Sequence, residues 1–84
     1  MGILTPAQKK LAFLAARRSM LEMERMTARF LEHRLSTLDE ATCQRVESLL
    51  QNPDLDLWDW ICGVKAPPED VDAEVLGWLR PFRA

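Results

Sequence analysis

Residues 17–24 read RRSMLEME, and the rest of the chain is interpreted around this octet. It places two cations, a helix-start signal and two acids between helical patterns, which is more typical of an exposed surface than of a catalytic pocket. Ser19 and Glu22 fit a capping box, in which each side chain accepts from the other residue's backbone N–H. The spacing therefore predicts that a second helix begins here. If the helix instead runs through unbroken, Arg18 and Glu22 stand four apart and can form an ion pair.

The length and composition indicate one small globular domain covering residues 1–84. Of these 84 residues, 48% are hydrophobic and 29% are charged, and no apolar run of about 18 residues exists to span a bilayer. We therefore expect a soluble, monomeric chain. The apolar start at residues 1–4 is too short for a signal segment, so we also expect a location in the cytoplasm of a bacterium.

The net charge of −2 hides an uneven distribution. Residues 1–35 hold 7 basic and 3 acidic side chains, whereas residues 36–84 hold 4 basic and 10 acidic ones. A basic segment can steer toward nucleic acid or toward an acidic protein face. Because the whole chain is acidic, an acidic protein surface is the better expectation, without a nucleic-acid or membrane partner.

The first two helices follow from caps and spacing. Residues 5–8, TPAQ, predict a helix start with Thr5 as N-cap and Gln8 completing a capping box, and this helix should end near Arg17. A second helix is expected over about 20–34. Its predicted inner side consists of Met20, Met23, Thr27, Phe30 and Leu31, while Met26 is left unassigned.

A third helix should begin with either Thr37 and Glu40 as a capping box or Asp39 as the cap, and Pro53 should stop it. Its predicted inner face is Cys43, Val46, Leu49 and Leu50.

A short fourth helix is expected over 54–63, capped by Asp54 or Asp56 and closed by Gly63. Trp60 should be its core aromatic residue, since Leu57, Trp60 and Ile61 share one side. Trp58 points elsewhere, either toward a partner or into partial packing under a neighbouring segment.

The loop over 66–70 contains paired prolines, and a last helix follows it. Its predicted face is Val71, Val75, Leu76 and Leu79, with Trp78 near the edge and Pro81 at the end. No alternation of period two is long enough for a strand. The sequence therefore predicts an all-α fold, a compact bundle of about five helices.

The inventory of reactive groups argues against an enzyme. There is no glycine-rich phosphate loop and no nucleophile with a matched base, and His33 is the only histidine. With no second histidine or paired cysteine at ligand spacing, no metal site is expected. Cys43 and Cys62 are interpreted as free, buried thiols in a reducing compartment. We therefore predict a binding module without a catalytic residue.

The octet resembles the signature of the succinate dehydrogenase flavinylation factors, also called assembly factor 2, which reads Arg-Arg-Gly-Met-x-Glu-Leu-Asp. Arg17, Arg18, Met20 and Glu22 match it outright. Ser19 stands where that family has glycine, and residues 23 and 24 stand where it has leucine and aspartate. A second similarity lies in residues 49–60, which resemble the family's Leu-Leu-x-x-x-Asp-x-Asp-Leu-x-x-Trp. The resemblance covers roughly residues 11 to 80.

The resemblance implies a small helical chaperone that docks on the flavoprotein subunit of succinate dehydrogenase or fumarate reductase and promotes covalent attachment of FAD. The FAD would belong to the client, so no cofactor is expected on this chain itself. The alternative is a helical adaptor or antitoxin-like protein-binding module with a different acidic partner. The predicted partner-binding residues are Arg17, Arg18, Ser19, Glu22, Met23, Glu24 and Trp58. Arg18 and Glu22 are expected to act at the client interface rather than in the fold.

Overall fold

The structure of the chain, a computed structural model, describes residues 3–83, so residues 1 and 2 of the apolar start lie outside the described residues. Five α-helices follow one another: α1 (Pro6–Ala15), α2 (Leu21–Arg34), α3 (Glu40–Leu50), α4 (Asp54–Cys62) and α5 (Ala73–Leu79). The short 3₁₀ turns η1 (Leu35–Thr37) and η2 (Arg80–Phe82) extend α2 and α5. No strand occurs in the described range, which confirms the predicted all-α bundle of about five helices.

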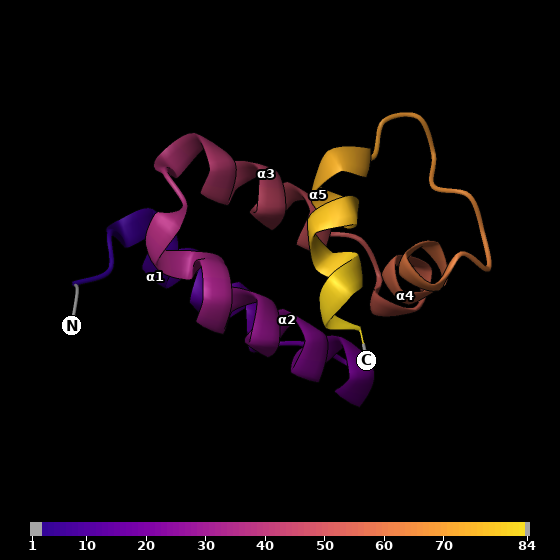
Figure 1. Cartoon of the computed structure of the whole chain (residues 1–84), viewed down its shortest axis with the longest axis horizontal. Coiled ribbons are helices and arrows are strands. Elements are labelled where there is room, and N and C mark those ends of the chain that lie inside the picture. Colours follow the sequence, from indigo (N-terminus) through magenta and orange to yellow (C-terminus); the bar gives the residue numbers. More distant parts are fainter. Residues whose placement is uncertain (1–2, 84) are drawn as a thin grey trace.

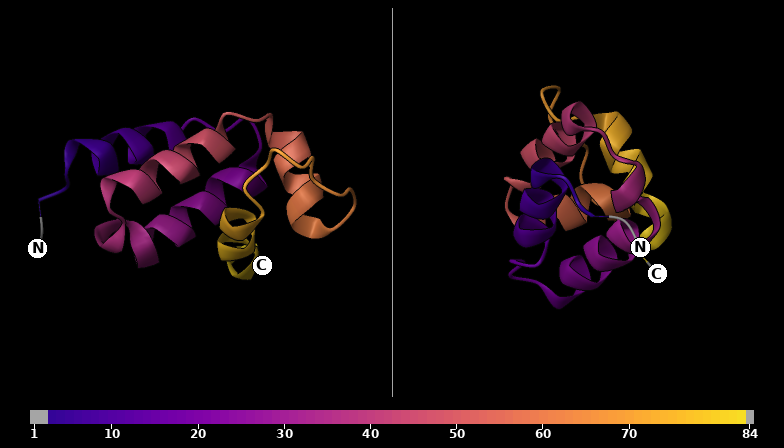
Figure 2. Two further views of the ribbon diagram at one scale, coloured as in Figure 1. Left: turned by 90° about the horizontal axis from the view of Figure 1, so that it is seen from above. Right: turned by 90° about the vertical axis from the view of Figure 1, so that its left-hand side faces the viewer.

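The first three helices run side by side along the long axis of the molecule (Figure 2). Helix α5 crosses them, and α4 lies at the end of the molecule away from the N-terminus (Figure 1). The whole is elongated, with extents of 38 × 25 × 20 Å. No helix among the described residues is long and apolar enough to cross a membrane.

Helix α1 begins at the predicted capping box. The Gln8 N–H donates to Thr5 Oγ1 at 3.1 Å, and the Thr5 N–H donates to Gln8 Oε1 at 3.0 Å. The side-chain Nε2 of Gln8 also donates to the backbone carbonyl of Leu38 at 3.0 Å, inside the protein. One side chain thus starts α1 and ties it to the segment that leads into α3.

The other helix ends use caps that the sequence only partly predicted. Asp39 is the cap of α3, since its carboxylate accepts from the Thr42 N–H at 2.8 Å, so the second of the two alternatives holds. Gly63 closes α4 with a φ of 79°, a left-handed conformation that favours glycine. Arg80 and Arg83 donate to the carbonyl of Ile61 near the end of α4, so the last residues of the chain also cap that helix.

The core joins the inner faces of all five helices. Its largest fully buried side chains include Phe30 and Met26. The predicted inner faces of α3 and α4 are confirmed, whereas on the predicted inner side of α2 Met20 and Leu31 are only partly buried. Cys43 is buried, and burial raises the pKa of its thiol. The prediction of a buried Cys62 is wrong, because Cys62 is the last residue of α4 and lies on its outward side, where it is exposed.

The two tryptophans of α4 differ in burial, as predicted. Trp60 belongs to the buried core, whereas Trp58 is partly buried against it. Partial packing is therefore the correct alternative for Trp58 in the isolated chain. We expect Trp60→Ala to lower the free energy of unfolding by about 3 to 5 kcal/mol and Trp58→Ala to lower it much less. Equal losses in a urea titration would contradict this arrangement of α4.

An ion-paired cluster fastens α5 to α3. Arg45 donates to Asp72 at 2.8 and 3.0 Å and to Glu74 at 2.6 Å, and its guanidinium lies 5.2 Å from the ring centroid of Trp78. Asp72 also caps α5 by accepting from the Val75 N–H at 3.2 Å. The hydrogen bonds from Arg45 hold the pKa of Asp72 below its ordinary value.

This lowered pKa predicts a pH dependence of stability. A carboxyl whose pKa is lower in the folded state stabilises the fold above its unfolded pKa, near about 3.9, and loses that contribution as the pH falls through the folded pKa. Wild type should therefore be more stable than Arg45→Gln at pH 7, and the difference should shrink below about pH 4. Urea titrations of both proteins from pH 7 to pH 3 check this, and a difference that stays constant over that range would refute it.

Candidate functional site

The octet occupies the connection from α1 to α2 and the first turn of α2. Asp54, at the start of α4, reaches this connection with its carboxylate. Its Oδ2 accepts from the backbone N–H of Ser19 at 2.6 Å, from the N–H of Met20 at 3.1 Å and from the Ser19 hydroxyl at 3.2 Å. The Asp54 side chain is only 4% exposed, so the carboxylate of one helix is buried against the start of another.

These bonds correct the two predicted arrangements of the octet. Met20, not Ser19, is the N-cap of α2, and no side chain of the octet caps this helix. The Ser19–Glu22 capping box is therefore wrong, because Asp54 takes the serine N–H that Glu22 would have accepted from. The unbroken helix with an Arg18–Glu22 ion pair is also wrong, since α1 ends at Ala15 and α2 begins at Leu21.

Asp54 also departs from its predicted role as the cap of its own helix. Pro53 is the N-cap of α4 and makes no side-chain cap, while Asp54 is the first residue inside the helix. There its negative charge lies at the positive end of the α4 dipole, a favourable position. In the sequence, only the match of Asp54 to the second family motif pointed to a special role for this residue. The sequence did not show that the two motifs lie together in the fold.

Arg18 completes the cluster from the octet side. Its Nη1 donates to the carbonyl of Leu50 at 2.9 Å and to Asp54 Oδ1 at 3.1 Å, and the side chain is 10% exposed. The guanidinium thus bonds the last carbonyl of α3 and pairs with the first carboxylate of α4. The expectation that the fold makes no demand on Arg18 is wrong, because this side chain joins three segments of the chain.

The two family-like motifs therefore meet in space. Arg18, Ser19 and Met20 come from the first, and Leu50 and Asp54 come from the second, 30 or more residues later. We call these five residues the Asp54 cluster. Its interactions are hydrogen bonds to charged groups in a mostly buried setting, which are stronger than neutral ones.

The remaining predicted site residues divide into exposed and buried ones. Arg17, Ser19, Glu22 and Glu24 are exposed, and the guanidinium of Arg17 lies 4.4 Å from the ring centroid of Phe13. Met23 is fully buried, so its predicted contact with a partner is wrong for the folded chain. Its position one turn before the buried Thr27 turns its side chain into the core.

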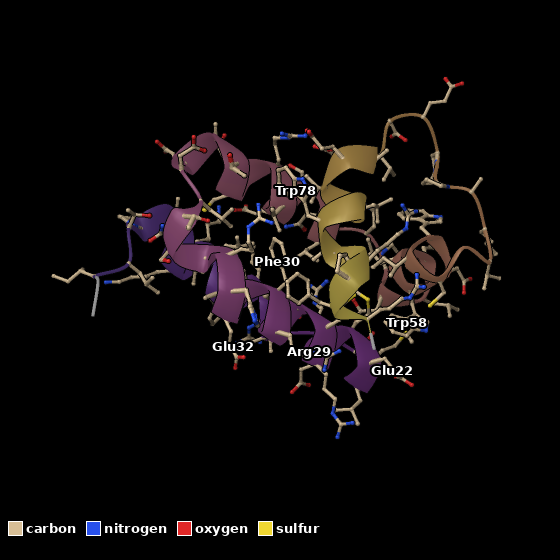
Figure 3. The ribbon with its side chains drawn as sticks, viewed as in Figure 1. Glu22, Arg29, Phe30, Glu32, Trp58 and Trp78 are labelled. Atoms are coloured by element: carbon tan, nitrogen blue, oxygen red, sulfur yellow. The ribbon has the colours of Figure 1, made fainter. Side chains whose placement is uncertain are left out.

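The exposed charges are free to meet a partner. Among the described residues, no ion pair involves Arg17, Glu22 or Glu24. Glu22 and Glu24 lie in the first turn of α2 but two residues apart, so they point to different sides of the helix. Figure 3 shows Glu22 at the end of α2 that lies toward α4 and Trp58.

A shallow hollow of about 250 Å³ adjoins the octet, lined in part by Arg17, Arg18, Ser19 and Asp54. Its lining is mainly polar, unlike the apolar pockets that hold most small-molecule ligands. The described part of the chain contains no group of three or more metal-ligating side chains. The octet thus lines an open polar surface rather than an enclosed apolar pocket.

Comparisons with known proteins agree with the resemblance of the motifs. A family model described as flavinator of succinate dehydrogenase matches residues 9–83. A protein of Dictyostelium discoideum named succinate dehydrogenase assembly factor 2, mitochondrial, is 33% identical over 69 residues, which is 82% of this chain and 49% of that protein. A protein of the same name from Culex quinquefasciatus is 28% identical over 75 residues, which is 87% of this chain and 47% of that protein.

The chain thus spans about half the length of the curated relatives that it matches. Both relatives are named as mitochondrial, and a bacterial cytoplasmic location for this chain stays a prediction. No solved structure matches the chain.

The burial of the Arg18–Asp54 pair yields a stability prediction. Removing one member of a buried ion pair costs about 3 to 5 kcal/mol, because the other charge stays buried without its partner. We expect Arg18→Ala to lose stability in this range, whereas Arg17→Ala, the matched control one residue earlier, should change it by less than about 0.5 kcal/mol. Because a single nitrogen makes both Arg18 contacts, Arg18→Lys should recover part of the loss. Equal unfolding midpoints for Arg18→Ala and wild type in urea would rule out the structural role.

Proposed function

The chain belongs to the family of flavinators of succinate dehydrogenase, and from this premise we propose that it binds the flavoprotein subunit of succinate dehydrogenase, or of the related fumarate reductase, and promotes covalent attachment of FAD there. The observation that carries the proposal is the match over residues 9–83, which contains both motifs of the Asp54 cluster. The names of the two relatives, assembly factors of the same enzyme, support it.

The exposed residues of the octet suit this task. Arg17 carries a permanently charged planar fork that can bond both oxygens of a client carboxylate. Glu22 and Glu24 offer carboxylates to client donors on two sides of α2. Ser19 is small enough for a client backbone to approach the connection closely. In this proposal Arg18 and Met23 act from inside the fold, holding the exposed residues in position.

Ser19 is compatible with this role although the family motif has glycine there. Glycine is required where φ is positive, but among the described residues Gly63 alone has a positive φ. Ser19 therefore adopts a conformation open to any residue, and its hydroxyl adds a bond to Asp54. We therefore expect that serine in place of glycine at position 19 leaves the connection between α1 and α2 in the same position.

In this proposal, the client and not this chain carries out the chemistry. The bond to the flavin would form within the flavoprotein subunit, while this chain supplies binding and orientation without holding FAD itself. What the chain contributes is a surface with charges of both signs fixed by a buried cluster. Such a surface selects a client by complementary charge and orients it on binding.

The proposal predicts the outcome of a complementation experiment. In cells that lack their own factor, covalent flavin on the flavoprotein subunit is read as in-gel fluorescence after expression of each variant. Truncating a charge that is desolvated at an interface costs about 2 to 5 kcal/mol of binding, so Arg17→Ala and Glu22→Ala should weaken client binding at least about 30-fold and reduce flavinylation.

The matched controls are Arg25→Ala and Glu32→Ala, which remove exposed charges of the same types from α2 further along the helix. They should leave flavinylation at the wild-type level. If Arg17→Ala and Glu22→Ala also restore it fully at matched expression, the octet is not the client-binding surface. If wild type itself neither binds the subunit nor supports flavinylation, the proposed function is wrong.

A further inference from the structure

The last four described residues, 80–83, connect two helices that have little direct contact with each other. Helix α4 packs against α5 and η2 packs against α2, whereas contact between α2 and α4 themselves is sparse. In Figure 1 the yellow end of the chain lies beside both α2 and α4. We call residues 80–83 the strap, because they form hydrogen bonds with both of these helices.

Arg29 of α2 holds one side of the strap. Its Nε donates to the backbone carbonyl of Phe82 at 3.1 Å, and its Nη2 donates to the same oxygen. No carboxylate of the described residues pairs with Arg29, so both of its bonded nitrogens serve the strap. The ring of Phe82 also meets the ring of the buried Phe30 edge-on, with the centroids 5.8 Å apart. A charged fork and a ring contact therefore fix the strap to α2.

Arg80 and Arg83 hold the other side of the strap on the end of α4. Arg80 donates to the carbonyls of Trp60 at 3.2 Å and Ile61 at 3.4 Å, and Arg83 donates to the carbonyl of Ile61 at 3.2 Å. No backbone N–H of the described residues donates to the Ile61 carbonyl, so its hydrogen bonds come from the strap. The last turn of α4 has no basic residue of its own, and the strap supplies two cations where the helix dipole favours them.

Helix α4 is thus held at both of its ends. Its first residue, Asp54, bonds the backbone of Ser19 and Met20, and its last turn bonds the strap. A helix of nine residues moves nearly as a rigid body, so α4 without the strap would be free to pivot about its first turn. Because hydrogen bonds are directional, such a pivot would weaken the bonds from Asp54 to the octet.

We propose that Arg29 is a positioning residue for client binding. It closes the strap, the strap fixes α4, and Asp54 of α4 holds the octet in the geometry that the flavoprotein subunit recognises. The part of this inference that concerns the client rests on the proposed function. Its effect on the octet is a property of the free chain and is measured without a client.

The first test follows hydrogen exchange of single amides in the free chain. Arg29→Gln removes the charged fork, so the amides of Ser19 and Met20 should exchange about tenfold faster than in wild type, and their rise should exceed that of Val46 in the core of α3. Arg25→Gln is the matched control, since Arg25 is an exposed arginine one turn earlier on α2, and it should keep the wild-type rates. An equal rise at all amides would report a global loss of stability and overturn the positioning role.

The second test measures binding of the purified flavoprotein subunit. Arg29→Gln should raise the dissociation constant about tenfold, as expected of a residue that acts on a binding surface without touching the ligand. Arg29→Lys should bind within about threefold of wild type, because an ammonium group can still donate to the Phe82 carbonyl. Arg25→Gln should bind like wild type.

A third variant releases the strap from its other side. Arg80→Gln/Arg83→Gln should speed exchange at Ser19 and Met20 and weaken client binding to a similar extent. Both arginines are exposed, so this variant keeps the fold and carries the same test where Arg29→Gln does not. Because the two sides act in series, adding Arg29→Gln should weaken binding no further, and additive losses would overturn the strap.

The outcomes separate this inference from the proposed function. If Arg29→Gln binds the client like wild type while Arg17→Ala binds it weakly, the positioning role is refuted and the proposed function stands. If Arg29→Gln weakens binding without faster exchange at Ser19 and Met20, Arg29 contacts the client directly and the positioning role is again refuted. If wild type does not bind the subunit, the proposed function is wrong and the client part of this inference falls with it, whereas the exchange rates still decide whether the strap holds the octet.

Discussion

The buried carboxylate of Asp54 is the interaction on which the rest of the structure depends. It supplies acceptors for the start of α2 and neutralises Arg18, which in turn bonds the end of α3. Three helix ends, whose backbone groups would otherwise need water or other caps, therefore meet at one charge pair. Because a buried carboxylate without these donors would be costly, the connection between α1 and α2 has little freedom to move.

This constraint explains how a small helical bundle can present a defined surface without a pocket. Arg17 and Glu22 flank residues that the Asp54 cluster holds in place, so their side chains start from fixed backbone positions. The less their backbone must be ordered on binding, the smaller is the entropy cost of contacting a client.

Much of the fold followed from the sequence, because local signals determine it. The capping box of Thr5 and Gln8, the helical spacing of the core residues and the αL glycine at Gly63 all involve residues close in the chain. The structure of the octet was predicted less accurately, because its hydrogen-bond partners, Leu50 and Asp54, are far away in the sequence. No local pattern reveals that a carboxylate will bond the start of another helix. Arg18 matches the family motif and Met23 stands at one of its positions, but a motif does not distinguish residues that contact a client from residues that support the surface.

Hydrogen exchange of single backbone amides in the free chain tests the central role of Asp54 most directly. If the carboxylate accepts from Ser19 and Met20, both amides should exchange much more slowly than those of exposed loop residues such as Glu69, although Ser19 itself is exposed. NMR at neutral pH would resolve them, and Asp54→Ala should abolish their protection. Exchange of both amides at the rate of the 66–70 loop in wild type would contradict the account.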